Sequence, residues 1–112
     1  MAKADSLQGS IDLLVLKILS RRPRLHGYAI MSAIQDMSSE VLRVEEGSLY
    51  PALHRMEKAG WVKAEWGLSE NNRRARFYKI TAAGRNRLRS EQEKWESVAQ
   101  AIALVLRSKA LA

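Results

Sequence analysis

Cysteine is absent from this 112-residue chain, which excludes disulfide bonds, thiolate zinc sites and cysteine nucleophiles. Long apolar runs are absent too: the longest extends only from Ala101 to Leu106, whereas a membrane-spanning helix needs about 20 apolar residues. The first residues, Met-Ala-Lys-Ala-Asp-Ser, are polar and lack the hydrophobic core of a signal peptide. We therefore expect a cytoplasmic protein of single-domain length that neither crosses a membrane nor is secreted.

Recognisable catalytic motifs are also missing: the chain has no glycine-rich phosphate loop, no H-E-x-x-H and no G-x-S-x-G. Glu45 and Glu46 are adjacent rather than spaced to face each other. His26 and His54 have no cysteine partners and form no recognisable metal site. We expect no enzyme activity, no cofactor and no metal. For His26 we expect a structural hydrogen bond at a helix start, and for Tyr28 a packed position at the helix junction.

Positive charge is abundant and unevenly distributed. Lys and Arg number 19 against 12 Asp and Glu, a formal net charge of +7. No acidic residue occurs between Asn71 and Ser90, and the cations of that segment equal the whole net charge: Arg73, Arg74, Arg76, Lys79, Arg85, Arg87 and Arg89. A localised cationic surface is typical of proteins that bind a phosphate backbone. The alternatives are a solvated face that only aids solubility and, less well supported, a contact with an anionic membrane surface.

Helical periodicity and helix-breaking residues predict three helices, a β-hairpin and a long last helix. The first helix covers 7–19, with Ser10 as its N-cap and a break at Pro23. The other expected elements are a helix from 26–28 to about 38, a strand over 41–44, a helix over 48–59, strands over 61–66 and 76–80 joined by a basic turn, and a helix capped by Thr81 that runs towards Ala110. The fold class is thus mainly α with a small β-hairpin: a winged helix-turn-helix domain over 1–81 and a C-terminal dimerisation helix over 82–112.

The third helix has two distinct faces. Its apolar residues gather on one side and, with the glycine that follows them, predict a core stripe: Leu49, Ala52, Leu53, Met56 and Gly60. Hydroxyl, imidazole and cationic groups lie on the other side, with Tyr50 at the flank: Ser48, Pro51, His54, Arg55 and Lys58. In a winged helix the third helix enters the DNA major groove and the hairpin, the wing, contacts the adjacent backbone. The alternative is an exposed face that serves only solubility.

Four segments in order resemble the PadR-type transcriptional regulators: Leu7-Gln-Gly-Ser-Ile-Asp-Leu-Leu-Val-Leu16, His26-Gly-Tyr28, Glu46-Gly-Ser-Leu-Tyr-Pro51, and Asn71-Asn-Arg-Arg-Ala-Arg-Phe-Tyr78 followed by Thr81-Ala-Ala-Gly84. The resemblance extends from Leu7 to at least Leu106, and the length resembles the small subgroup with one C-terminal helix. It implies a dimeric bacterial repressor that binds a pseudo-palindromic operator and responds to a small, often aromatic effector. It also implies that the helix carrying 47–51 is the recognition helix and that 69–74 is the wing tip.

Roles follow for the candidate DNA-binding residues. We expect Ser48 and Tyr50 to donate to phosphates, and His54, Arg55 and Lys58 to enter the groove, where the fork of Arg55 suits guanine. At the wing, backbone or minor-groove contacts are expected from Asn72, Arg73 and Arg74, while Arg76 and Lys79 support the electrostatic field.

The last helix carries an apolar stripe at heptad spacing. With Leu14 of the first helix, it gives the expected dimer interface: Leu88, Trp95, Val98, Ala99, Ile102, Val105 and Leu106. The stripe packs either on the chain's own first helix or on a second subunit. We favour a dimer, because a small winged-helix core cannot cover both the apolar first helix and this long stripe. Trp95 is either interface filler or one wall of a site where an aromatic effector stacks.

Together these features predict a sequence-specific DNA-binding transcriptional regulator, a homodimeric repressor that a small effector releases from its operator. We expect it in the bacterial cytoplasm, at the nucleoid when bound to DNA. The alternative is a winged-helix module that binds protein or RNA without an operator.

Overall fold

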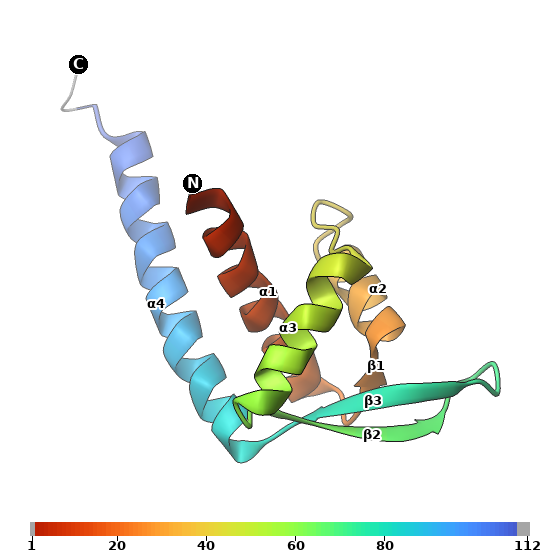
Figure 1. Ribbon diagram of the computed structural model, residues 1–112. Helices are drawn as coiled ribbons and strands as arrows, with labels where there is room; N and C mark the ends of the chain where they lie inside the picture. The colour runs from red at the N-terminus through yellow and green to blue at the C-terminus, as the bar shows by residue number, and fades with distance from the viewer. Residues whose placement is uncertain (1, 110–112) are drawn as a thin grey trace.

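The computed structural model describes the backbone of residues 2–109 and the side chains of residues 10–109 (Figure 1). Along this part of the chain the elements are α1 (Ala2–Arg21), β1 (Leu25–His26), α2 (Gly27–Met37), α3 (Glu46–Lys58), β2 (Val62–Leu68), β3 (Arg74–Ile80) and α4 (Ala82–Arg107). Three helices lie over one face of a small sheet, and α4 leads away from it. The fold is therefore mainly helical with a β-hairpin, the winged-helix arrangement that the sequence predicted.

The sheet is antiparallel, with the strand order β1-β3-β2. Register pairs Val62 with Ile80 at the base of the hairpin and Leu68 with Arg74 near its tip. Asn72 adopts a left-handed conformation (φ 61°) in the connecting turn, as expected for an asparagine there. The hairpin projects well beyond the helices as a wing (Figure 1).

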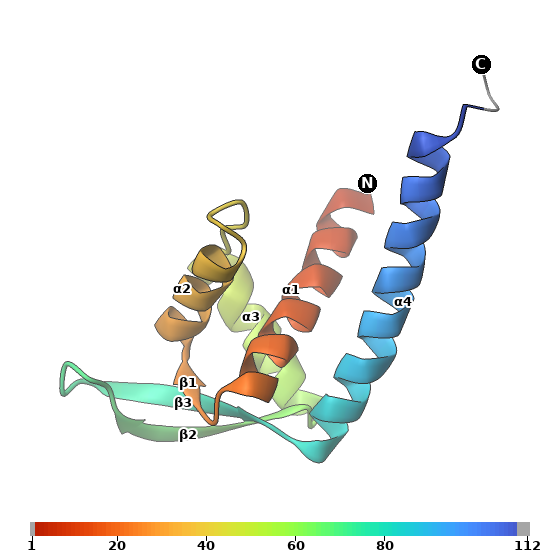
Figure 2. The ribbon, with the colours of Figure 1, turned by 180° about the vertical axis from the view of Figure 1, so that it is seen from behind.

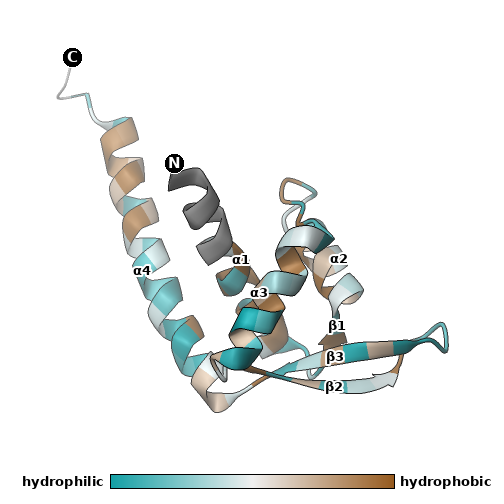
Figure 3. Cartoon of the chain, in the orientation of Figure 1, coloured by the Kyte–Doolittle hydropathy of each residue, from teal (hydrophilic) through white to brown (hydrophobic). Residues whose placement is uncertain are grey.

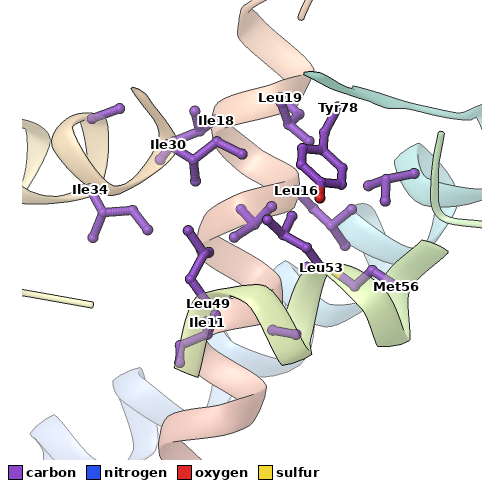
Figure 4. Packing of buried hydrophobic residues seen from close by; sticks show 14 of the residues in the cluster. Ile11, Leu16, Ile18, Leu19, Ile30, Ile34, Leu49, Leu53, Met56 and Tyr78 are labelled. Carbon is purple, nitrogen blue, oxygen red and sulfur yellow. The ribbon is translucent and has the colours of Figure 1, made fainter. Parts of the chain in front are cut away.

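The core lies where α1, α2 and α3 meet the helix-facing side of the sheet (Figure 4). Its fully buried large side chains come from all of these elements: Val15, Leu16, Leu19, Ile30, Ile34, Leu49, Leu53, Met56 and Val62. The predicted core stripe of α3 is confirmed for Leu49, Ala52, Leu53 and Met56, which are buried. It is wrong for Gly60, which is exposed and follows the end of the helix at Lys58 with a positive φ of 83°. The opposite face of α3 is thereby turned outward, and this orientation positions the candidate site.

Helix α4 begins at the Thr81 cap, whose hydroxyl accepts a hydrogen bond from the Gly84 amide at 3.0 Å. The helix then runs beside α1 and extends past its end (Figures 1 and 2). Leu88 was predicted for the dimer interface, but it is buried near the start of α4 against the chain's own core, because this first part of α4 packs on α1. Lys17 of α1 reaches Gln92 at 3.4 Å. Beyond this point hydrophobic residues of α4 face solvent in the single chain (Figure 3).

Three local predictions are wrong. Residues 41–44 form a loop, and the additional strand is β1, which pairs with β3. The reason is tertiary: Ser39 and Glu40 take positive φ values of 52° and 65°, which reverse the chain after α2 and direct 41–44 towards α3 rather than the sheet. Ser10 lies inside α1 and is not its N-cap. At the other end, α4 closes at Arg107 before the predicted Ala110, which lies outside the described residues.

We expect Gly84→Ala to destabilise the fold by about 2–3 kcal/mol, because overpacking at a rigid neighbour is not relieved by a side-chain rotation. A Cβ at this position would collide with the Trp61 carbonyl oxygen and lie 2.8 Å from Cγ1 of Ile80. Gly47→Ala is the matched control, since a Cβ there has no neighbour within 4 Å and alanine favours the helix. Urea unfolding measures both changes, and equal stabilities for the two variants would contradict the prediction.

Candidate nucleic-acid interface

The outward face of α3 carries polar and cationic groups on a rigid helix. Ser48, Pro51, His54 and Lys58 are exposed there, while the core stripe anchors the opposite side. Tyr50 lies at the edge that faces the wing, and burial, with a smaller contribution from Glu46, raises the pKa of its hydroxyl. The phenol therefore stays protonated near neutral pH and can donate a hydrogen bond to an anion.

Arg55 occupies the other edge of this face, towards α1. Its guanidinium contacts the Asp12 carboxylate at 2.6 Å, and both side chains are partly shielded. Burial raises the pKa of Asp12 above its ordinary value, although the Arg55 charge opposes the shift. The group expected to read a base is thus engaged with α1 in this structure, and a contact of Arg55 with DNA requires it to leave Asp12.

The wing arginines fall into two groups. Arg73 and Arg74 are exposed near the tip beside Asn72. Arg76 lies closer to the helices and binds Glu57 of α3 at 2.8 Å, so that it fastens the wing to that helix. Lys79 binds Glu65 across the hairpin at 3.2 Å. Two cations of the segment 71–90, which contains no acidic residue, thus pair with carboxylates of other elements: Arg76 and Lys79.

A groove of about 680 Å³ separates the wing from the starts of α2 and α3. It is lined by residues of all three elements: His26, Gly27, Tyr28, Tyr50, Trp66, Ser69, Glu70, Asn71, Arg73, Arg74, Ala75 and Arg76. Aromatic rings and guanidinium groups together form its walls. The groove thus brings the wing tip and Tyr50, predicted separately from the sequence, to one site.

The sequence interpretation missed two aromatic groups of this groove. Tyr28 is 69% exposed, so the prediction that it packs at a helix junction is wrong. Trp66 is 58% exposed and lies beneath the side chains of Arg74 and Arg76. Its place beyond Val62 and Ala64 on one face of the strand is visible in the sequence, but its arginine partners follow only from the register.

Two small features support the groove wall. His26 caps α2, because its Nδ1 accepts a hydrogen bond from the Ala29 amide at 3.1 Å, and this confirms the predicted structural role. Gly27 lies directly against the Tyr50 ring: a Cβ there would be 2.6 Å from Cζ of the tyrosine. Any larger residue at position 27 would displace Tyr50.

A second concavity of about 430 Å³ lies between α1, α4 and the loop that leads into α3. Leu13 and Leu14 of α1 and Trp95 of α4 give it an apolar lining, with Gln92, Glu96 and Lys17 contributing polar groups. The structure therefore brings Leu14 and Trp95 to one cleft. The residues of the α4 stripe that follow Trp95 are exposed, except for the half-buried Ala99: Val98, Ile102, Val105 and Leu106.

The described part of the chain contains neither a candidate metal site nor a candidate membrane-spanning helix. No group of three or more His, Asp or Glu side chains among these residues could hold a metal ion. A search of the same residues finds no helix with the length and hydropathy needed to span a bilayer.

Comparisons with known proteins identify the family and the fold. The model of the transcriptional regulator PadR-like family matches residues 15–90. A transcriptional regulator from Clostridium thermocellum has a similar structure, with a TM-score of 0.78 at 30% identity over 88% of this chain and 95% of that one. A PadR family transcription regulator from Clostridium difficile gives a TM-score of 0.71 at 28% identity, over 86% of this chain and 97% of that one.

The sequence comparison agrees. A transcriptional regulator from Mycobacterium tuberculosis is 35% identical over 68 residues, 61% of this chain and 63% of that one. Because the family model matches more than half of the chain and the fold is shared over most of its length, this protein belongs to the PadR-like family of transcriptional regulators.

Proposed function

We propose that the chain is a homodimeric repressor that binds a pseudo-palindromic operator through α3 and the wing. The observation that carries this proposal is the groove that Tyr50 of α3 lines together with Arg73 and Arg74 of the wing. In winged-helix proteins the third helix enters the major groove while the wing meets the neighbouring backbone. Exposed guanidinium and phenol groups on two walls suit a sugar–phosphate chain passing between them.

Within this site the residues have different proposed roles. His54 and Lys58 project from the outward face of α3 and enter the major groove, and Ser48 and Tyr50 donate to phosphates at its edge. Asn72, Arg73 and Arg74 contact the backbone or minor groove from the wing tip. Arg55 reads a base only after exchanging Asp12 for DNA, whereas Arg76 orients the wing through Glu57.

The dimer proposal rests on the exposed stripe of α4. Trp95 and Ile102 are 56% and 54% exposed, and Val98 and Val105 lie on the same side of the helix. Contiguous apolar surface of this kind is unfavourable in water and is typically covered by a partner. A second copy of α4 and α1 around a two-fold axis would cover it and place two α3 helices on half-sites about one DNA turn apart.

The effector proposal rests on the cleft beside Trp95. Its volume of about 430 Å³ and its leucine and tryptophan lining suit a planar aromatic compound. The dimer could adopt two arrangements that differ in the distance between the two α3 helices. An effector that binds one arrangement more tightly than the other would shift the dimer towards it. Titration of planar aromatic compounds with detection of tryptophan fluorescence tests this, with Trp95→Phe as control; quenching that is unchanged in the control would leave Trp95 as packing.

Duplex binding is tested with DNA from the region upstream of the gene, by gel shift and footprinting over a range of salt concentrations. A protected pair of half-sites and a steep loss of affinity with salt are expected. Single-stranded RNA and an unrelated duplex are the controls. Equal affinity for RNA and DNA, or no binding at low salt, would instead favour the module that binds RNA or protein.

A further inference from the structure

Trp66 presents an aromatic face to the arginines of the wing. Cζ of Arg74 lies 4.7 Å from the ring centroid, and Cζ of Arg76 lies 5.9 Å from it. The register explains the placement: Trp66 pairs with Arg76, and Leu68, two residues further along β2, pairs with Arg74. The side chains of Trp66, Arg74 and Arg76 line the groove between the wing and the helices. Trp66 is nevertheless largely outside the core, so packing of the fold does not account for it.

The two arginines at this tryptophan differ in their ion pairs. Arg76 binds Glu57, which neutralises its charge locally. For Arg74 the described residues supply no carboxylate partner, and its only charge-related contact among them is the Trp66 ring. A guanidinium held over an aromatic face keeps the N–H donors at its edge available for a bidentate contact with phosphate. An ion pair with a carboxylate would occupy those same donors.

From this arrangement, and resting on the proposed DNA-binding function, we propose that Trp66 is a positioning residue that holds Arg74 in the groove for one phosphate of the DNA backbone. Arg74 is a long side chain, and ordering it before binding reduces the entropy lost when the complex forms. Tyr50 on the opposite wall offers a second donor to the same backbone. Glu70 also lines the groove, and its negative charge repels an anion. An anion is therefore attracted to the part of the groove that the arginines line.

The test is a double-mutant cycle on the full chain. Trp66→Leu, Trp66→Phe, Arg74→Ala and Trp66→Leu/Arg74→Ala are titrated by fluorescence anisotropy against a random-sequence duplex of about 30 base pairs, nearly three turns. A random duplex suffices because a phosphate contact is independent of sequence. Leu68→Ala is the matched control, since Leu68 is an exposed apolar residue of the same strand and pairs with Arg74 without an aromatic face.

We expect Trp66→Leu to weaken binding about five- to tenfold and Trp66→Phe to retain most of the affinity, since phenylalanine also attracts a guanidinium. In the Arg74→Ala background, Trp66→Leu should change the affinity by less than about twofold. Leu68→Ala should bind like the wild type. Circular dichroism and thermal unfolding show which variants are folded. If the leucine variant unfolds, a folded Trp66→Phe variant that binds as weakly as Arg74→Ala overturns the inference.

Two results would overturn the inference. Unchanged affinity in a folded Trp66→Leu variant would show that Arg74 needs no aromatic support. An equal loss in both backgrounds would show that Trp66 acts on DNA directly or through the fold rather than through Arg74. A wild-type protein that ignores the duplex at low salt contradicts the proposed function itself, whereas wild-type binding with either of the other results contradicts only the role of Trp66.

Discussion

Ile102→Asp on α4 is expected to convert the proposed dimer into a monomer and to weaken operator binding at least about a hundredfold. Ile102 lies in the exposed apolar stripe with Trp95 and Val98. A two-fold axis through this stripe would bring two aspartates into one apolar contact, where each loses its hydration and repels the other. Analytical ultracentrifugation gives the mass in solution, and a gel shift with the operator gives the affinity.

Leu104→Asp provides a matched control for this change. Leu104 is 73% exposed and points away from the stripe, because two residues along a helix correspond to a rotation of about 200°. The same charge is therefore added to the same helix outside the proposed interface. We expect this variant to remain dimeric and to bind DNA like the wild type. Two dimeric variants, or two monomeric ones, would contradict an interface along the stripe.

The second large effect is expected at the wing tip. Arg73→Ala combined with Arg74→Ala should weaken duplex binding about 10- to 100-fold at low salt and lower the slope of log K against log salt concentration by about two. Both side chains are exposed and border the groove, so their removal leaves the core intact. Anisotropy titrations at several salt concentrations measure the affinity and the slope together.

The control for the wing variant must remove the same charge elsewhere. Arg107→Ala combined with Lys109→Ala does so, because both residues are exposed at and just after the end of α4, outside the cationic segment 71–90. We expect a much smaller change in slope, since only cations close to phosphates release counterions on binding. A wild-type slope in the wing variant would remove the wing from the interface, and equal slopes in both variants would indicate an effect of net charge alone.

Agreement between sequence and structure is best where a feature depends on neighbours along the chain. The four buried residues of the predicted α3 stripe, the Thr81 cap and the left-handed Asn72 all follow from local periodicity or local hydrogen bonding. The 41–44 segment shows the limit of such reasoning. Its β-branched residues suit a strand, but a strand needs a partner edge, and the turn after α2 directs the segment away from the sheet.

Among the candidate site residues, the sequence correctly separated the buried and outward faces of α3 but not the partners of their charges. Arg55 and Lys58 are only three residues apart, yet Arg55 contacts Asp12, whereas Lys58 forms no ion pair within the described residues. This difference depends on the packing angle between α1 and α3, which cannot be inferred from the spacing of residues within α3. Trp66 was overlooked for the same reason, because its arginines come from another strand.

Residue order alone was enough to predict the four helices and the hairpin in their order, the buried face of α3, the caps at His26 and Thr81, the concentration of cations in one segment and the excess apolar stripe of α4. Each of these is set by residue types at fixed short spacings, and backbone geometry converts such spacings into faces. The pairing of Asp12 and Glu57 with two of the expected DNA-binding arginines, Arg55 and Arg76, became visible only in the folded chain. The same is true of the groove that Trp66, Tyr50 and Arg74 share. Those contacts join residues far apart in the chain, and their distances are fixed by the packing of helices on the sheet rather than by any local preference.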